Sequence, residues 1–255
     1  MSACPLTARP ALSARPALAV ALLALAPLAA LASTTLYDPA LGSLPSAQGW
    51  LPLVFGGFAS EGLGDGFYAL DTSGAGVSYW GNRLISPLAL DTQAGFDLSF
   101  SLQLLSESHS RPNRAGFALM LVGAQATQAL ELEFWAGNIW AQKYDASQPD
   151  RFVHDSDVAF DTTAALTPYT LAMRQQQFTL SAGGTALLWG ALRDYTLGGL
   201  PYTTPNFLFL GDNSSHGNSI SRLGAVGLSP VPEPVAGWLL GLGALGLAGL
   251  ALSRR

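Results

Sequence analysis

The chain has 255 residues, of which 49% are hydrophobic and only 11% are charged, and its formal net charge is −5. With 17 Asp and Glu against 12 Lys and Arg, the composition excludes a basic surface for nucleic acid. The single cysteine is Cys4, so the rest of the chain has no disulfide, no thiol nucleophile and no cysteine metal ligand.

The first segment, 1–32, has the pattern of a secretory signal peptide. Arg9 and Arg15 give a positively charged start, an apolar stretch follows, and Ala30 and Ala32 meet the small-residue rule for cleavage. A membrane anchor is the alternative, but the apolar stretch is too short to span a bilayer. We therefore expect export through the secretion translocon and removal of this segment by signal peptidase.

The central region, 33–230, shows the period-2 alternation that is typical of β-strands and no helical pattern of any length. The clearest case is GFDLSFSLQLLSE, where the side chains expected on one face are Phe96, Leu98, Phe100, Leu102 and Leu104. Gly, Asn and Pro separate the strands, and no linker divides the region. Many short strands without intervening helices predict one all-β domain, an antiparallel sandwich.

The order of these strands resembles the concanavalin A-like jelly roll of lectins and laminin-G domains. The resemblance is carried by a strand over 116–123, the LELEFW strand at 130–135, a hairpin over 169–192 with a Gly-Gly turn, and a closing strand at 220–230. It rests on strand order and not on an invariant motif. It implies a two-sheet antiparallel jelly-roll β-sandwich and, as in lectins, carbohydrate as the candidate ligand.

Two glutamates in the LELEFW strand are the candidate catalytic residues. Glu131 and Glu133 are two residues apart, so they should share one face of the strand with backbones roughly 6.5–7 Å apart. Jelly-roll glycosidases place a nucleophile and an acid/base in this manner, with carboxyl groups about 5–5.5 Å apart for retention. The glucanase pattern E-x-D-x-x-E is not met. Glu133 stands where the pattern has Asp, and Ala136 stands where it has the last Glu. The alternative is a polar strand face opposite Leu132 and Phe134.

The stretch FLGDNSSHGNS is the candidate ligand or calcium loop. Its polar residues include Asp212, Asn213, His216 and Asn218. Their side chains could hold Ca²⁺ or hydrogen-bond sugar hydroxyls, while turn chemistry alone is the alternative, because Asp, Asn and Gly favour turns. No histidine or carboxylate spacing typical of a metal site accompanies them, so no cofactor is expected apart from the open question of Ca²⁺.

Near the C-terminus, the segment 235–253 has no charged residue and would make roughly 28 Å of helix, enough to cross a bilayer. Two arginines follow it, so the positive-inside rule places this end in the cytoplasm and the bulk of the chain outside.

The tail 231–255 resembles the PEP-CTERM sorting signal of Gram-negative bacteria. The residues that match its order and position are Val231, Pro232, Glu233, Pro234, Arg254 and Arg255. The resemblance implies recognition by an exosortase, a membrane protease-transpeptidase, in a bacterium that makes exopolysaccharide and biofilm. A permanent single-span anchor is the alternative.

Together these features predict an exported, exosortase-processed, non-enzymatic surface or matrix protein. It would pass through an inner-membrane-anchored intermediate with its domain in the periplasm before it reaches the cell surface or extracellular matrix. Exopolysaccharide is the candidate ligand. A glycan hydrolase that uses Glu131 and Glu133 is the alternative. A purely structural envelope protein is a second one, favoured if the tryptophans prove buried: Trp50, Trp80, Trp135, Trp140 and Trp189.

Overall fold

The computed structural model describes residues 33–56, 59–74, 79–84 and 89–231. The predicted signal peptide, the membrane-spanning segment 235–253 and the sorting motif after Val231 lie outside the described residues. Within the described ranges, no helix is long and apolar enough to cross a membrane.

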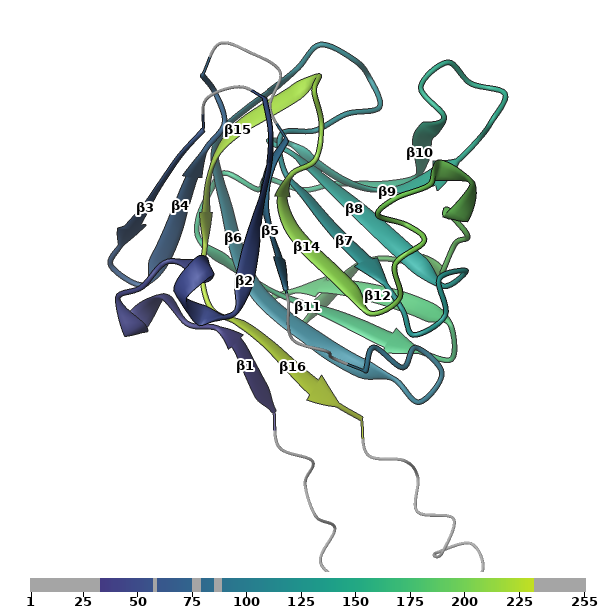
Figure 1. Cartoon of the computed structure of the whole chain (residues 1–255), viewed down its shortest axis with the longest axis horizontal. Coiled ribbons are helices and arrows are strands. Elements are labelled where there is room, and N and C mark those ends of the chain that lie inside the picture. The colour runs from purple at the N-terminus through teal and green to yellow at the C-terminus, as the bar shows by residue number, and fades with distance from the viewer. Residues whose placement is uncertain (1–32, 57–58, 75–78, 85–88, 232–255) are drawn as a thin grey trace, which may run out of the picture. The chain divides into compact units, whose positions relative to one another are not determined.

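The described strands form two antiparallel sheets that pack face to face as a sandwich, so the predicted all-β architecture is confirmed (Figure 1). Sheet A has the order β13 (Thr185–Ala191), β12 (Gln177–Ala182), β11 (Thr167–Arg174), β6 (Phe96–His109), β15 (Gly217–Leu223), β4 (Phe67–Asp71) and β3 (Ser60–Gly64), with β16 (Val226–Pro230) paired to β6 and β1 (Thr34–Tyr37) paired to β16. Sheet B has the order β10 (Phe152–Ala159), β9 (Asn138–Tyr144), β8 (Ala129–Trp135), β7 (Ala118–Val122), β14 (Phe207–Asp212), β5 (Tyr79–Leu84) and β2 (Trp50–Phe55).

Strand β6 shows why this sequence makes a sandwich. Its predicted apolar face, from Phe96 to Leu104, is buried between the sheets, while the alternate residue Ser99 is exposed and Asp97 is half-buried. Alternation with a period of two sends one side of a strand into the core and the other to solvent. The prediction for this strand is confirmed.

Sheet B departs from that simple pattern, because its central strands are buried on both faces. All five residues of β7 are buried, and so are the first six of β8. Leu130, Leu132 and Phe134 point into the core between the sheets. The other face of sheet B is therefore covered too, although it faces away from sheet A.

The cover over this outer face is a second apolar cluster, which we call the outer cluster. A segment that contains the short 3-10 helix η3 (Thr196–Gly198) supplies two of its aromatic rings, and the rest come from β7, β8 and β14. Its buried members are Met120, Val122, Ala129, Tyr195, Tyr202, Phe207 and Phe209. Two further 3-10 helices, η1 (Pro39–Leu41) and η2 (Pro45–Gln48), connect β1 to β2.

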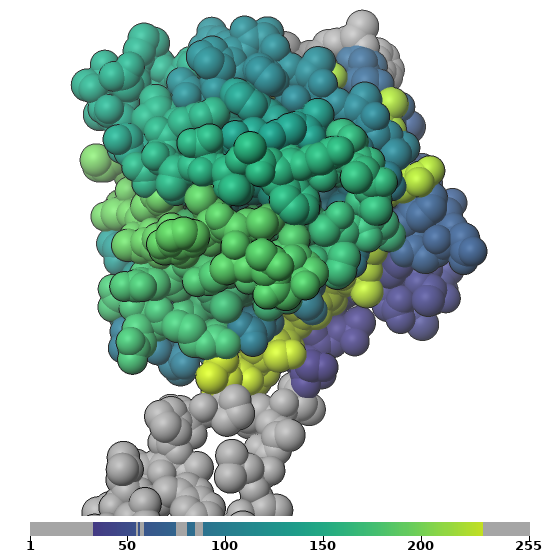
Figure 2. All heavy atoms as spheres, turned by 180° about the vertical axis from the view of Figure 1, so that it is seen from behind, coloured from purple at the N-terminus to yellow at the C-terminus, as the bar shows by residue number. Residues whose placement is uncertain are grey.

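The first and last strands of the described chain lie side by side. Thr34 of β1 is opposite Leu228 of β16 in antiparallel register. The purple and yellow segments are adjacent both in Figure 1 and in the reverse view of Figure 2. The sandwich thus begins and ends at one corner of sheet A.

Candidate functional site

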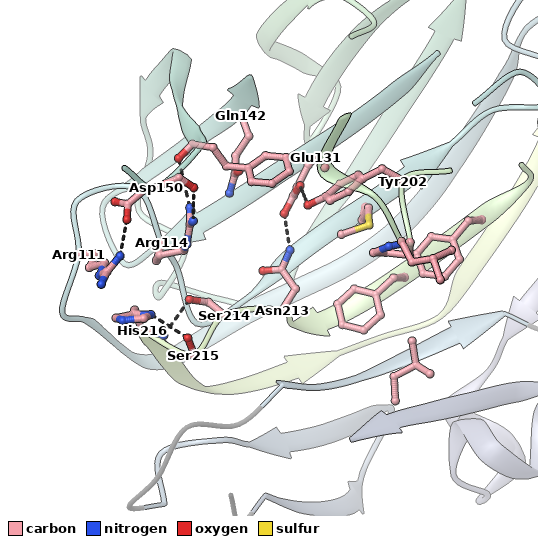
Figure 3. A pocket seen from close by; sticks show the side chains of 18 of the residues that line it. Arg111, Arg114, Glu131, Gln142, Asp150, Tyr202, Asn213, Ser214, Ser215 and His216 are labelled. Carbon is pink, nitrogen blue, oxygen red and sulfur yellow. Dashed lines mark hydrogen bonds and ion pairs between the residues drawn. The ribbon is translucent and has the colours of Figure 1, made fainter. Parts of the chain in front are cut away.

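A cavity of about 640 Å³ opens on the outer face of sheet B (Figure 3). Its floor is made by side chains of β2, β7, β8, β9 and β14. Its walls come from segments around 111–114, 149–152, 198–202 and 213–216. Cavities of this size are typical of small-molecule and oligosaccharide sites, so we take it as the candidate site.

Glu131 and Glu133 share the outer face of β8, as predicted, but that face is not solvated. Their side chains are 1% and 0% exposed. Glu131 lines the cavity, whereas Glu133 lies behind it, next to Trp140 in the register of β8 and β9. The two glutamates thus form a polar face opposite Leu132 and Phe134, and the outer cluster and neighbouring loops cover that face.

Each buried carboxyl group has specific donors. Tyr202 Oη donates to Glu131 Oε2 at 2.6 Å, and Asn213 Nδ2 donates to Glu131 Oε1. Gln142 Nε2 donates to Glu133 Oε1. Tyr195 Oη donates to the backbone carbonyl of Gln142 at 2.5 Å, which fixes the strand beneath that amide. Hydrogen bonds of this kind make it possible to bury the two carboxyl groups.

The two carboxyl groups influence each other's ionisation. Burial raises the pKa of Glu133 well above its usual range, and the negative charge of Glu131 raises it further. Burial also raises the pKa of Glu131, but donation from Tyr202 and Asn213 opposes this rise. The upward shift of the pKa is therefore stronger for Glu133 than for Glu131.

One side of the cavity carries two arginines. Arg111 forms an ion pair with Asp150. Arg114 Nη2 donates to the backbone carbonyl of Asp150 at 2.9 Å, and its Nη1 donates to that of Phe152 at 3.2 Å. Within the described ranges, Arg114 makes no ion pair with a carboxylate. Its charge opposes the rise of the pKa of Glu131, and both side chains line the same cavity.

The four residues of the predicted ligand loop do not lie together in the structure. Asn213 and His216 line the cavity, while Asp212 and Asn218 do not. Asp212 ends β14 and is fully buried, with Oδ1 accepting from the Ser214 backbone N–H at 2.9 Å. Successive residues of a strand point to opposite faces, so Asp212 and Asn213 turn away from each other.

The same loop does not bring together the oxygen ligands that a calcium ion needs. Asn213 is engaged with Glu131, and Asn218 Oδ1 accepts from Ser108 Oγ at 3.0 Å. In the part of the chain that the structure describes, no three His, Cys, Asp or Glu side chains are placed to hold a metal ion. Calcium prefers six to eight oxygen ligands around one point, and this arrangement does not fit it.

Sequence reasoning missed several residues of the site: Arg111, Arg114, Gln142 and Tyr202. No spacing connects them, because Tyr202 is 71 residues from Glu131 and Asn213 is 82 residues from it. The only signal in the sequence was that Gln142 follows the LELEFW strand in an expected hairpin.

None of the tryptophans whose side chains the structure describes lines the cavity. Trp50 and Trp140 are buried, and Trp135 is half-buried with its ring stacked on His109 at 4.2 Å. Trp189 is 69% exposed and lies on β13 of sheet A. The side chain of Trp80 is outside the described part. The condition that favoured a purely structural role, burial of these side chains, is therefore not met by Trp189.

No protein-family model matches the chain, and no curated protein matches it. Solved structures do resemble it. A carbohydrate esterase of the Shiga toxin-encoding bacteriophage phi24B has a TM-score of 0.55 at 17% identity and covers 79% of this chain and 100% of its own. The carbohydrate recognition domain of Emp46p in its metal-free form has a TM-score of 0.51 at 10% identity, over 78% of this chain and 97% of its own. The exoplasmic/lumenal domain of VIP36 in a Ca²⁺/Man-bound form has a TM-score of 0.48 at 12% identity, over 77% and 89%. The two neighbours with TM-scores above 0.5 include a carbohydrate recognition domain, and the predicted resemblance is confirmed at the level of the fold.

Proposed function

We propose that the protein binds a saccharide in the cavity on the outer face of sheet B. The observation that carries this proposal is a preformed cavity whose wall combines fixed polar groups with aromatic rings. Saccharide sites need both, because hydroxyl groups require hydrogen-bond partners and the C–H faces of a sugar ring require apolar contact.

The polar groups are held in place before any ligand arrives. Tyr202 and Asn213 are fixed by Glu131, and Arg114 is fixed by the carbonyl groups of the 150–152 segment. Ser215 Oγ and His216 Nδ1 are 2.8 Å apart and add a hydroxyl and an imidazole at the rim. Preorganised groups lose little conformational entropy on binding, which favours affinity.

The proposed cellular context follows from the two ends of the sequence. The signal peptide would direct export, and the PEP-CTERM tail would make the protein an exosortase substrate of an exopolysaccharide-producing Gram-negative bacterium. The protein would then be a non-enzymatic component of the cell surface or biofilm matrix, with exopolysaccharide as its ligand. The resemblance of the fold to carbohydrate recognition domains supports this proposal.

The test is cosedimentation of the full chain with the exopolysaccharide of the producing organism, with and without Ca²⁺, while reducing ends are measured in parallel. Binding without release of reducing ends and without dependence on Ca²⁺ is the expected result. Arg111→Gln should weaken binding, because Arg111 lines the cavity. Arg174→Gln is the matched control, since Arg174 is similarly exposed and also pairs with an aspartate, Asp97, but on sheet A. Equal loss in both variants, or no binding by the wild-type chain, would contradict the proposal.

Glycan hydrolysis is the second candidate, and one observation favours it. A carboxyl pair whose pKa values are raised by burial lies directly beneath the cavity, and such groups serve as general acids at neutral pH. Only Glu131 reaches the cavity wall, however, so the two-carboxylate arrangement expected of a retaining glycosidase would need a second group. Release of reducing ends that disappears in Glu131→Gln would establish this function, and unchanged release would exclude Glu131 as the catalytic residue.

A further inference from the structure

The cavity over sheet B has a polar end and an apolar end. The polar end is formed on β8 and β9 and by the segments around Arg111 and His216. The apolar end is formed on β7, β14 and β2, where Met120, Phe209 and Leu53 line the floor. In Figure 3 Arg111, Arg114, Asp150 and His216 gather on one side of the pocket, and Tyr202 lies on the other.

The strand order gives the distance between the polar end and the apolar end. From β9 to β2 the sheet runs through β8, β7, β14 and β5, which makes five strand spacings and roughly 24 Å. A ligand that fills the cavity therefore meets hydrogen-bonding groups at one end and hydrocarbon at the other. The two ends are far enough apart to contact different parts of one molecule.

The floor of the apolar end depends on a glycine. A Cβ atom added at Gly81 of β5 would lie 2.2 Å from Cζ of Phe209. The ring of Phe209 thus lies directly on the backbone of β5, between β14 and β2. Leu53 is opposite Gly81 in the register of β2 and β5, so the ring and Leu53 form one continuous apolar surface.

This surface continues into solvent at the mouth of the cavity. Leu200 lines the cavity and is 81% exposed, and Leu51, on the same face of β2 as Leu53, is 42% exposed. Exposed leucines next to an apolar floor lose contact with water when a ligand covers them, which favours binding of a hydrocarbon group.

We propose that the ligand of this cavity is a saccharide that carries an apolar substituent such as an O-acyl group. The sugar lies at the polar end near Asn213 and His216, and the acyl chain lies on Phe209 and Leu53 under Leu200. This inference rests on the proposed saccharide-binding function. An unsubstituted saccharide that reached the apolar end would lose hydrogen bonds to water without new partners. A simple hydrocarbon that filled the cavity would displace water from the guanidinium of Arg114 and would offer it no hydrogen-bond acceptor in return.

The test is a glycan array of paired oligosaccharides, in which the members of a pair differ only in a single O-acetyl or O-butyryl group, probed with the full chain. Each buried methylene should strengthen binding about fourfold, so a butyryl ester, which has two more methylenes, should bind about fifteenfold tighter than the acetyl ester. Leu200→Asp should bring the ratio between acylated and free saccharide toward one. Leu41→Asp is the control, because Leu41 is also highly exposed but lies on η1 outside the cavity lining.

The outcomes separate the two proposals. Equal binding of both members of every pair overturns the acyl inference and leaves saccharide binding standing. Absence of binding to any member overturns saccharide binding and the acyl inference with it. Sodium butyrate and sodium octanoate are included as competitors, since a free carboxylate could occupy the arginine end. Full competition by either salt at the concentration where the acylated saccharide binds would show that the sugar is not recognised, and would also overturn the inference.

Discussion

Asp212 provides a quantitative test of the buried electrostatics next to the site. Its side chain is fully buried, Oδ1 accepts one backbone hydrogen bond, and Oδ2 has no hydrogen-bond partner among the residues that the structure describes. Burial raises the pKa of this carboxyl from 3.8 to about 8, and the nearby Glu107 carboxylate adds to the rise. In the folded protein Asp212 is therefore mostly protonated at neutral pH, while in the unfolded chain it is ionised.

The sign of the effect on stability follows from this difference. The folded state favours the proton, so its contribution to stability is fully present below pH 4 and is lost as the pH rises toward 8. The free energy of unfolding falls over the interval of about three pH units between the pKa of the unfolded state and pH 7. At about 1.4 kcal/mol per unit, the loss at pH 7 is about 4 kcal/mol. Asp212→Asn removes the titration and retains an oxygen for the Ser214 N–H, but it buries an extra amide hydrogen at a cost of about 1–2 kcal/mol.

The variant should therefore be about 2–3 kcal/mol more stable than the wild-type chain at pH 7, and no more stable near pH 4. Urea unfolding followed by tryptophan fluorescence at half-unit steps of pH measures this, with a midpoint shift of about 1 M expected at pH 7. Asp145→Asn is the control. Hydrogen bonds from Ser147 lower the pKa of the exposed Asp145, so its replacement should act weakly and in the opposite direction. A difference between Asp212→Asn and wild type that does not change with pH would show that Asp212 is ionised in the folded state.

Three further changes test the packing around the cavity. Tyr202→Phe removes the donor to the buried Glu131 and should lower stability by about 1.5–3 kcal/mol, which thermal unfolding at pH 7 would register; an unchanged midpoint would mean that the bond is not formed. Gly81→Ala places a methyl group against the ring of Phe209 and should destabilise the protein by about 1–3 kcal/mol in urea unfolding, whereas a neutral result would refute the position assigned to that ring. Leu98→Ala opens a void in the core between the sheets and should cost about 2–5 kcal/mol, measured in the same way; a cost below about 1 kcal/mol would contradict its burial.

The sandwich could be predicted from the sequence because local patterning determines which face of a strand is buried. The alternation in β6 identified its core face, and the same rule placed Glu131 and Glu133 on one side of β8. Periodicity does not tell what covers a face, however. The cover over the glutamates comes from Tyr202 and Asn213, whose approach depends on how distant segments fold over the sheet.

In the loop after β14, residues that are adjacent in the sequence proved to be separated in space. Asp212 and Asn213 are neighbours in a polar stretch, so composition suggested one ligand loop. The strand continues to Asp212, and alternation sends that side chain inward while Asn213 reaches the cavity. A polar run beside a strand end is thus divided by the strand geometry, and clustering in sequence did not translate into clustering in space.

The pairing of β1 with β16 also has a mechanical consequence. Because the two strands are antiparallel, the chain enters β1 and leaves β16 at the same end of the pair, where Thr34 is opposite Leu228. A force that draws these two ends apart would break the hydrogen bonds between β1 and β16 one after another. It would then separate β16 from β6. Sheet B contains neither strand. A protein stretched between its ends would therefore yield first at this corner, while the sheet that carries the cavity keeps its shape.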